Sequence, residues 1–497
     1  MEKIKKHQFS IIYGILALFS LVYLVQRSAS KGLFFTGVFG IVVLVLEIGG
    51  FFFLRKWLRK QNKLEKIYLP IAIFFGILYL FAFPLSQLPD EEADYLRSLE
   101  VANFHATSDW EGKAVGREFS TNIEKVYDAE NYSDMLEDID LKLNSETQFY
   151  AFSNKSLYAF VCYLPQAFGV GISSFFGASI VLQSLIGKIF NYAFFVLLIY
   201  LSIKYIPFKK MLIFFIALLP ITMQEAVSLS PDAMTIAVSV ALIAFILYLK
   251  NGTNQKMRKK HYVILSLLMV ALSLCKIVYL PLCFLIFLIP KERFSSKKQK
   301  YLFCCLLSLA VVLLNLFWLK ISSQYLVAFE SRSNSSLQLQ YILENPFRYL
   351  IVIFATIDAF SISYLGEMVG QTLGVFKVPT SSIMVIVSLG VLFYLISKHE
   401  KEVKKSVCTL KEKIFLLVMI LGTVLLMFTS LYLQWTAVSS STIDGIQGRY
   451  FIPLLLAISM FWMKTEEKDS KEENNSIITC SVMTNVMALI SIFVTFI

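Results

Sequence analysis

Long runs of apolar residues are the feature that most limits how this chain can fold. Several runs exceed 18 residues, roughly the length at which a helix spans the hydrocarbon core of a bilayer. Hydrophobic residues make up 57% of the 497 residues and charged residues only 16%, a balance that excludes an ordinary soluble enzyme. The sequence therefore predicts an all-α polytopic membrane protein with about 13 transmembrane helices.

Basic residues are concentrated in the short loops between the apolar runs. Loop 55–66 holds six basic residues against one acid, whereas the polar segment 87–156 holds 16 acids against six basic residues. The positive-inside rule places the N-terminus and loop 55–66 in the cytoplasm, and the polar segment on the extracytoplasmic side of the cell membrane. This pattern accounts for the net charge of +11, so the charge does not indicate a nucleic-acid partner. The lipid bilayer is the expected partner.

Three parts of the chain are predicted to differ in organisation. Residues 1–66 are expected to form two membrane helices and a basic cytoplasmic loop. Residues 67–465 are expected to form the membrane core, including an extracytoplasmic loop over 87–177. Residues 466–497 are expected to form a cytoplasmic loop and a last transmembrane helix.

Two apolar runs in the core do not fit single crossings. The run 262–290 has basic loops at both ends, so it must cross an even number of times and is predicted to break at Lys276. The run 347–370 leaves no room for a crossing, because the next run must lead to the lysine-rich loop 398–413. The run is therefore a re-entrant segment or an interfacial one, or the crossings around it are miscounted.

The sequence lacks the usual signatures of soluble enzymes. It has no glycine-rich phosphate loop, no nucleophile elbow and no His/Cys metal spacing. Its seven cysteines show no paired spacing, so neither a disulfide framework nor a zinc site is predicted. Any chemistry must come from charged residues near the membrane surface and within the apolar runs.

The stretch PDEEADYLR, residues 89–97, opens the polar segment directly after an apolar run. If Pro89 begins a helix, Asp90, Asp94 and Arg97 share one face. Carboxylates at the membrane surface can stay ionised and meet a substrate, so this face is a candidate reaction centre. The alternative is a solvated helix start whose acids complement the helix dipole.

Five short blocks together resemble the bacterial membrane-protein family of domain of unknown function 2142, which belongs to the GT-C glycosyltransferase superfamily. The blocks are Pro89-Asp90-Glu91 with Ala93 and Arg97, YLPQAFG at 163–169, GKIFN at 187–191, Leu219-Pro220 with Gln224 and SLSPD at 228–232, and GIQGRY at 445–450. Their order is the same as in the family. The family pattern often has His where this chain has Asp94, which puts any role for imidazole there in doubt.

The resemblance implies a GT-C-like bundle with an acidic first large extracytoplasmic loop. It also implies transfer of a sugar from a polyprenyl-phosphate donor to a cell-surface glycan acceptor of the cell envelope. One carboxylate would act as general base, with Asp90 the first catalytic candidate and Glu91 the second. Cations would stabilise the departing lipid phosphate, and the candidates are Arg449, Lys276 and Lys188.

The remaining expected substrate-binding residues come from the same blocks. They are Asp94, Arg97, Gln166, Asn191, Gln224, Asp232, Gln447 and Tyr450. Asp232 would orient the acceptor or hold a divalent cation, the one cofactor considered, but a helix cap explains it equally well.

Two other classes of function stay open at the level of sequence. In a transporter or flippase of a lipid-linked saccharide, the same cations would hold the phosphate without chemistry. Against it, no paired inverted halves are found, and the key acids lie in a loop rather than at the membrane midplane. The third class, a scaffold of a cell-envelope machine, needs no acidic cluster.

Overall fold

The computed structural model describes residues 2–326, 333–398, 408–462 and 471–496. Within this part of the chain, eight helices are long and apolar enough to cross a membrane. They are α1 (Glu2–Ser28), α2 (Leu33–Lys60), α9 (Ile180–Tyr205), α12 (Asp232–Leu247), α15 (Lys297–Ser322), α17 (Pro346–Val369), α19 (Leu410–Gln434) and α21 (Lys471–Phe496). The prediction of an all-α polytopic membrane protein is confirmed.

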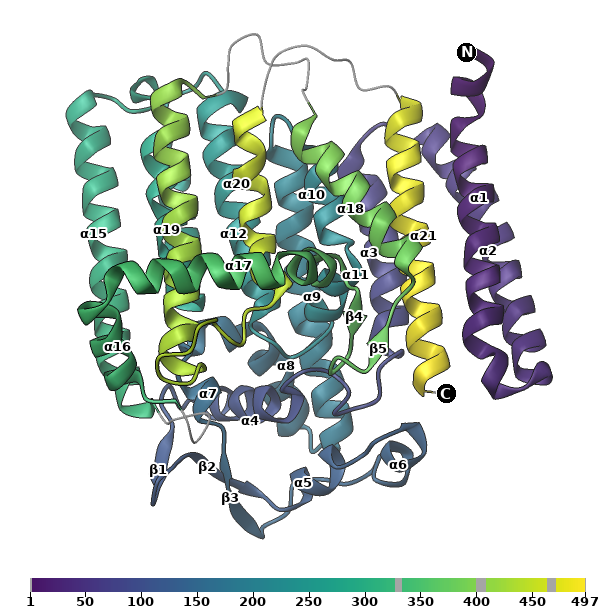
Figure 1. The fold of residues 1–497 in the computed structure, drawn as a ribbon, viewed down its shortest axis with the longest axis horizontal. Coiled ribbons are helices and arrows are strands. Elements are labelled where there is room, and N and C mark those ends of the chain that lie inside the picture. The colour runs from purple at the N-terminus through teal and green to yellow at the C-terminus, as the bar shows by residue number, and fades with distance from the viewer. Residues whose placement is uncertain (1, 327–332, 399–407, 463–470, 497) are drawn as a thin grey trace.

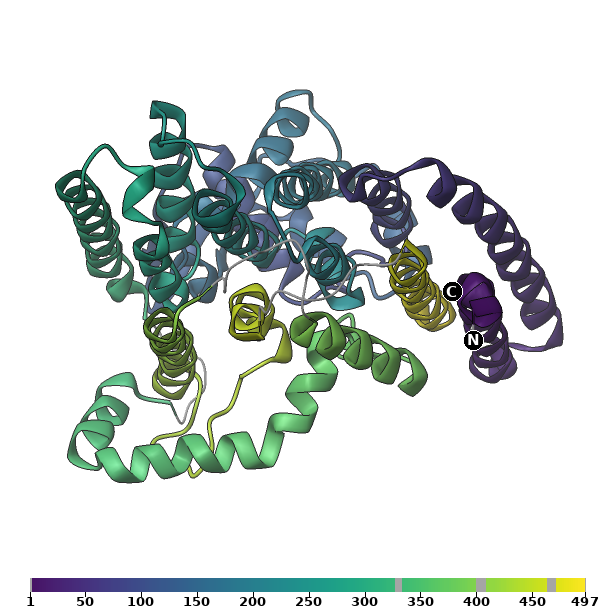
Figure 2. The ribbon, with the colours of Figure 1, turned by 90° about the horizontal axis from the view of Figure 1, so that it is seen from above.

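Shorter apolar helices complete the bundle. Length alone does not settle which of them cross the membrane, so the count of 13 transmembrane helices stays a prediction. They are α3 (Leu64–Leu80), α8 (Leu164–Phe175), α10 (Lys210–Ala217), α11 (Pro220–Ala226), α13 (Lys259–Cys275), α14 (Leu280–Cys283), α18 (Ser382–Ser397) and α20 (Leu455–Ser459). Helices α1 and α2 lie at one edge of the bundle, where α1 packs against α21 (Figures 1 and 2). Helix α12 lies inside, and nearly all its residues are buried against α9, α13 and other neighbours.

The run 262–290 is broken at Lys276, as the charge pattern predicts. Helix α13 ends at Cys275, and Lys276 is extended with φ −146° and ψ 121°. The chain continues through the short elements η4 (Ile277–Tyr279), α14 and η5 (Phe284–Leu288). Because Pro281 lacks a backbone N–H, it fits only the first turn of a new helix and cannot continue the old one.

Helix α17 runs sideways across α12, α15 and α19 (Figure 1). Seen from above, it lies along one side of the bundle (Figure 2). Its exposed face is mostly apolar and includes Phe347, Phe354 and Ile362, although Arg348 and Asp358 are exposed as well. Of the alternatives for 347–370, this orientation favours an interfacial helix, because a helix that crosses the bundle sideways does not span the membrane.

The polar segment folds at one end of the membrane helices (Figure 1). It contains α4 (Glu91–Ala102), α5 (Asn122–Tyr127), α6 (Tyr132–Glu137), α7 (Ser153–Ser156) and a sheet of β1 (Asp109–Glu111), β2 (Ala114–Ser120) and β3 (Thr147–Ala151). The strands are antiparallel in the order β1-β2-β3, with Trp110 opposite Val115 and Arg117 opposite Tyr150. Aromatic and aliphatic side chains such as Tyr95 and Phe152 form a hydrophobic cluster here that is separate from the main core of the bundle.

Further short elements lie toward the same end of the bundle. They are η2 (Phe160–Tyr163), η7 (Ser323–Tyr325), α16 (Ser335–Glu344), η8 (Gly448–Leu454) and a two-stranded ladder of β4 (Thr372–Leu373) and β5 (Val378–Pro379). Helices α8 and α9 cross closely at Gly169 and Gly187, where a Cβ on Gly169 would lie 2.7 Å from the Ile186 carbonyl oxygen. Two of the sequence blocks therefore carry glycines for packing.

Candidate functional site

The structure corrects the predicted start of the helix that carries the acidic stretch. Helix α4 begins at Glu91, not at Pro89, and Asp90 precedes it with φ 56° and ψ 25°. Aspartate is one of the few residues that visit this left-handed conformation without great cost. The Asp90 side chain is 54% exposed, whereas Glu91 and Asp94 are buried. Asp90 is therefore the most exposed carboxylate of this stretch, ahead of the half-buried Glu92.

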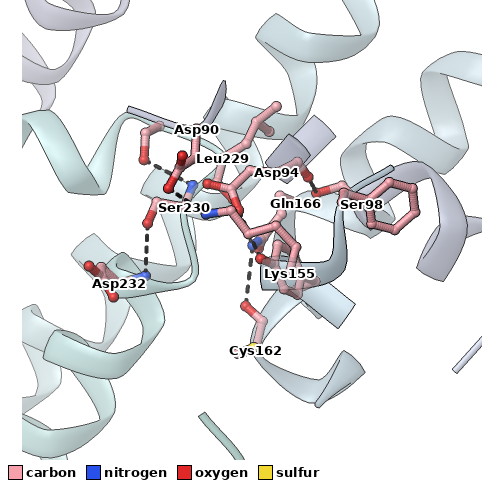
Figure 3. Close-up of polar contacts among 12 residues, drawn as sticks. Asp90, Asp94, Ser98, Lys155, Cys162, Gln166, Leu229, Ser230 and Asp232 are labelled. Atoms are coloured by element: carbon pink, nitrogen blue, oxygen red, sulfur yellow. Dashed lines mark hydrogen bonds and ion pairs between the residues drawn. The ribbon is translucent and has the colours of Figure 1, made fainter. Parts of the chain in front are cut away.

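Lys155 brings the two aspartates together. Its Nζ lies 3.1 Å from Asp90 Oδ2 and 3.0 Å from Asp94 Oδ1 (Figure 3). Tyr163 donates a hydrogen bond of 2.8 Å to the same Asp94 oxygen. We call Asp90, Asp94, Lys155 and Tyr163 the α4 cluster. Sequence reasoning missed Lys155, and its one signal was that it is a basic residue in a strongly acidic segment.

Burial raises the pKa of Asp94 to about 7, and the nearby charge of Asp90 acts in the same direction. The Lys155 ammonium and the Tyr163 hydroxyl oppose this rise. Burial lowers the pKa of Lys155, but the two aspartates outweigh it and raise the pKa overall. Asp94 can therefore gain or lose a proton near neutral pH, while Lys155 stays charged.

Glu91 and Lys188 form a buried ion pair between α4 and α9. Both charged groups are almost fully shielded from solvent. Removing either would leave an uncompensated buried charge, so the pair fixes α4 on the membrane helices. The pair also leaves Glu91 less accessible than Asp90.

Gln166 and Asn191 hold the turn that precedes α12. The Gln166 side chain donates to the Leu229 carbonyl (3.1 Å), and the Asn191 side chain donates to the Ser228 carbonyl (2.8 Å). Both amides are fully buried. They position the N-terminus of α12, and direct contact with a substrate stays a prediction for both.

A second charged group, which we call the α12 cluster, consists of Glu225, Asp232, Lys276 and Arg449. Asp232, the first residue of α12, is ion-paired to Lys276 and lies 3.4 Å from Arg449 Nε. Arg449 Nη1 also lies 2.6 Å from Glu225 Oε1. The ammonium of Lys276 sits over the Tyr450 ring, 4.7 Å from its centroid. The structure therefore brings together residues from three separate parts of the chain, around positions 225–232, 276 and 449.

Tyr158 connects the two clusters. The Lys276 ammonium lies 5.6 Å from its ring centroid, and its hydroxyl interacts electrostatically with Lys276, Lys155 and Asp232. Lys155 and Asp232 also interact electrostatically, and Figure 3 shows Asp232 across from the aspartates of the α4 cluster. The two clusters thus form one charged site at one end of the bundle.

The other predicted residues support this site rather than line it. Arg97 is fully buried, ion-paired to Glu100, and donates to the backbone carbonyls of Ala106 (2.9 Å) and Tyr158 (3.3 Å). Because Asp90 lies outside α4, the expected helical face shared by Asp90, Asp94 and Arg97 does not form. Gln224 accepts a hydrogen bond from the Gly374 amide (2.7 Å).

Gln447 and Gly448 lead into η8, which carries Arg449. The Gln447 carbonyl accepts from the Tyr450 amide (3.1 Å), and the Gly448 amide donates to Glu367 of α17 (2.8 Å). A Cβ on Gly448 would overlap the Tyr364 carbonyl oxygen and the Met368 amide of α17. Helix α17 and η8 can pack this closely only because residue 448 has no side chain.

Gly448→Ala is therefore expected to lower the thermal stability of the purified protein, by about 1–3 kcal/mol, because backbone atoms cannot move aside as a flexible side chain can. The matched control is Gly422→Ala in α19, where the nearest atom to a new Cβ is 3.8 Å away. Thermal unfolding in detergent compares the two variants. Equal melting temperatures would contradict the close approach of η8 and α17.

A cavity of about 210 Å³ lies between η4, α15 and α19 and reaches the charged site. Tyr158, Lys276 and Tyr450 form its polar end. Its other walls are mainly apolar and include Leu157, Trp318, Leu319, Met427 and Leu431. The arrangement suits a ligand with an anionic group and an apolar chain.

Asp232, a predicted ligand for a divalent cation, contacts cationic side chains in the structure. One of its carboxylate oxygens is ion-paired to Lys276, and the other lies near Arg449. Among the described residues, no group of three His, Cys, Asp or Glu side chains could hold a metal ion. A divalent cation at Asp232 stays a prediction.

Fold and site together define the class as an α-helical polytopic membrane protein with a charged site at one end of its bundle. The family model "Predicted membrane protein (DUF2142)" matches residues 73–458, and the chain belongs to this family. The match includes both clusters and leaves out α1, α2 and α21. No curated protein and no solved structure matches the chain.

Proposed function

We propose that the protein is a GT-C-type glycosyltransferase. It moves a sugar from a polyprenyl-phosphate donor to a cell-envelope glycan on the extracytoplasmic face of the cell membrane. The observation that carries the proposal is an exposed carboxylate, Asp90, in the same charged site as a cavity lined by Lys276 and mainly apolar side chains. A lipid-linked donor needs both features, since its phosphate is charged and its chain is apolar.

The donor would enter the cavity from the bilayer. Helices α15 and α19 flank the cavity, and most of their apolar side chains are exposed. In a membrane, such surfaces face lipid, so the polyprenyl chain need not leave the bilayer. The phosphate would then meet Lys276, with Arg449 behind it.

The reaction would be a direct displacement at the anomeric carbon of the donor sugar. Asp90 takes the proton from the acceptor hydroxyl, whose oxygen forms the new bond to that carbon. The bond between the anomeric carbon and the phosphate oxygen breaks, and Lys276 and Arg449 stabilise the leaving lipid phosphate. Lys155 orients the Asp90 carboxylate, and Glu91 is committed to Lys188.

The function is tested by incubating the purified protein with a synthetic polyprenyl-phosphate sugar and glycan from the host cell wall. Transfer of the sugar to the glycan in this assay supports a transferase. So does loss of that sugar from the surface polysaccharide of cells that lack the protein. A transporter would return the donor unmodified and would change only its distribution across the membrane. That result would overturn the proposal.

The proposed orientation places the N-terminus in the cytoplasm and the polar segment outside. Cysteines introduced at the exposed positions Glu111 and Asn62 should then react differently with a membrane-impermeant thiol reagent. In intact cells only the cysteine at position 111 is expected to be labelled, and in opened cells both. Labelling at position 62 in intact cells would reverse the topology.

A further inference from the structure

The hairpin of β1 and β2 carries an exposed tryptophan that the proposed reaction does not use. Trp110 lies on the edge strand β1 and is 46% exposed. Gly112, with φ 58°, lies in the turn between the strands. A single exposed apolar side chain is common on protein surfaces, so a binding role depends on how the indole is held and on what lies beside it.

The indole faces the membrane helices rather than the far side of the sheet. Trp110 lies opposite Val115, and side chains two apart on a strand share a face, so Trp110 shares its face with Val115 and Arg117. Val115 is fully buried, and Arg117 is ion-paired to Glu100 of α4 (3.0 Å). This face therefore packs on the rest of the protein.

Tyr325 of η7 fixes the position of the indole. The ring centroids of Trp110 and Tyr325 are 6.4 Å apart, with the planes inclined by 34°. Tyr325 is itself buried, and its hydroxyl donates to the Ser108 carbonyl (2.9 Å). A preorganised aromatic ring loses little conformational entropy when a ligand binds to it.

Neighbouring segments connect the tryptophan to both halves of the charged site. Tyr325, which contacts the indole, belongs to η7, and Ser323 of η7 and the following Leu326 line the cavity that contains Lys276. Ser108, two residues before Trp110, is hydrogen-bonded to Ser156 (2.7 Å), the neighbour of Lys155. A ligand on the indole would therefore lie beside the segments that line the cavity and carry Lys155.

We propose that Trp110 is a stacking platform for a pyranose ring of the acceptor glycan. The C–H groups of a sugar face carry partial positive charge and suit the negative face of an indole. The donor sugar is the other source of a pyranose ring. The acceptor fits better, because the apolar walls and Lys276 engage the lipid phosphate while the indole lies outside the cavity lining. The assignment rests on the proposed function.

The test uses the full-length protein in nanodiscs and oligosaccharides released from the host cell wall by mild acid. Trp110→Ala is expected to weaken oligosaccharide binding roughly three- to tenfold, as measured by saturation-transfer NMR and titration. Trp110→Phe should keep most of the affinity, which separates stacking from misfolding. The matched control is Phe104→Ala, another exposed aromatic of the polar segment (97% exposed), which should bind like the wild type.

The outcomes separate the two sources of sugar. The KM for a synthetic polyprenyl-phosphate sugar should not change in Trp110→Ala. A raised donor KM with unchanged oligosaccharide affinity would overturn the assignment, and so would unchanged binding in both assays, as expected of a lipid-anchoring indole. If Trp110→Ala weakens oligosaccharide binding in a protein that transfers no sugar, the platform stands and the proposed function fails.

Discussion

Asp90→Asn is expected to transfer sugar at roughly a hundredth to a ten-thousandth of the wild-type rate, since loss of a general base typically costs this much. The amide keeps the shape of the side chain but cannot accept the proton. The fold should survive, because the Asp90 side chain makes no helix-capping hydrogen bond, and the buried Lys155 keeps its ion pair with Asp94 (3.0 Å) when Asp90 loses its charge. The measurement is initial transfer rate from a synthetic donor.

The matched control is Asp140→Asn, which makes the same change at an exposed position of the polar segment and should keep wild-type turnover. Membrane insertion and donor binding of both variants are measured beside the rate. Equal turnover by wild type and Asp90→Asn would remove Asp90 from the mechanism. Glu91 would then become the candidate, despite its buried pair with Lys188.

Lys276→Met is expected to weaken binding of a synthetic polyprenyl phosphate roughly ten- to a hundredfold, the value of a charge-assisted hydrogen bond to a phosphate. Methionine keeps a flexible chain of similar length in the cavity but removes the charge. The single change should also destabilise the fold, because it leaves Asp232 with only part of its compensating charge. Affinity and thermal stability are therefore measured together.

Two further variants separate phosphate binding from stability. The double change Lys276→Met with Asp232→Asn removes both charges of the pair, so it should regain thermal stability without regaining affinity. Lys320→Met, an exposed lysine near the end of α15, should behave like the wild type in both assays. Unchanged affinity in Lys276→Met would place the lipid phosphate elsewhere and would falsify the proposed donor site.

The class of fold followed from local properties of the sequence. Apolar runs predict helices because backbone groups in a bilayer must bond within their own segment, and this holds whatever the neighbours are. The break at Lys276 followed from the basic loops on either side of 262–290. The sideways path of α17 was left among alternatives, because its length and hydropathy equal those of a spanning helix.

The residues of the site were partly predictable, and their roles were less so. The blocks pointed to Asp90, Asp232 and Arg449, and the charge within the apolar run 262–290 pointed to Lys276. The structure places all four in the two clusters. Arg97 also belongs to one of the blocks, yet its side chain is buried and ion-paired to Glu100. The left-handed backbone at Asp90 was not predictable, because the Pro-Asp pair also fits a helix that begins two residues earlier, at Pro89.

What the sequence determined by itself was the membrane class, the position of most helices and the charged residues that lie near their ends. These depend on hydropathy and charge, which each residue carries wherever it lies. Only the tertiary structure decided which charges meet. Lys155 and Asp90 are 65 residues apart, and Arg449 and Glu225 are 224 apart. Such pairs form because the packed helices bring their ends together, and buried charges remain only where that packing supplies a partner.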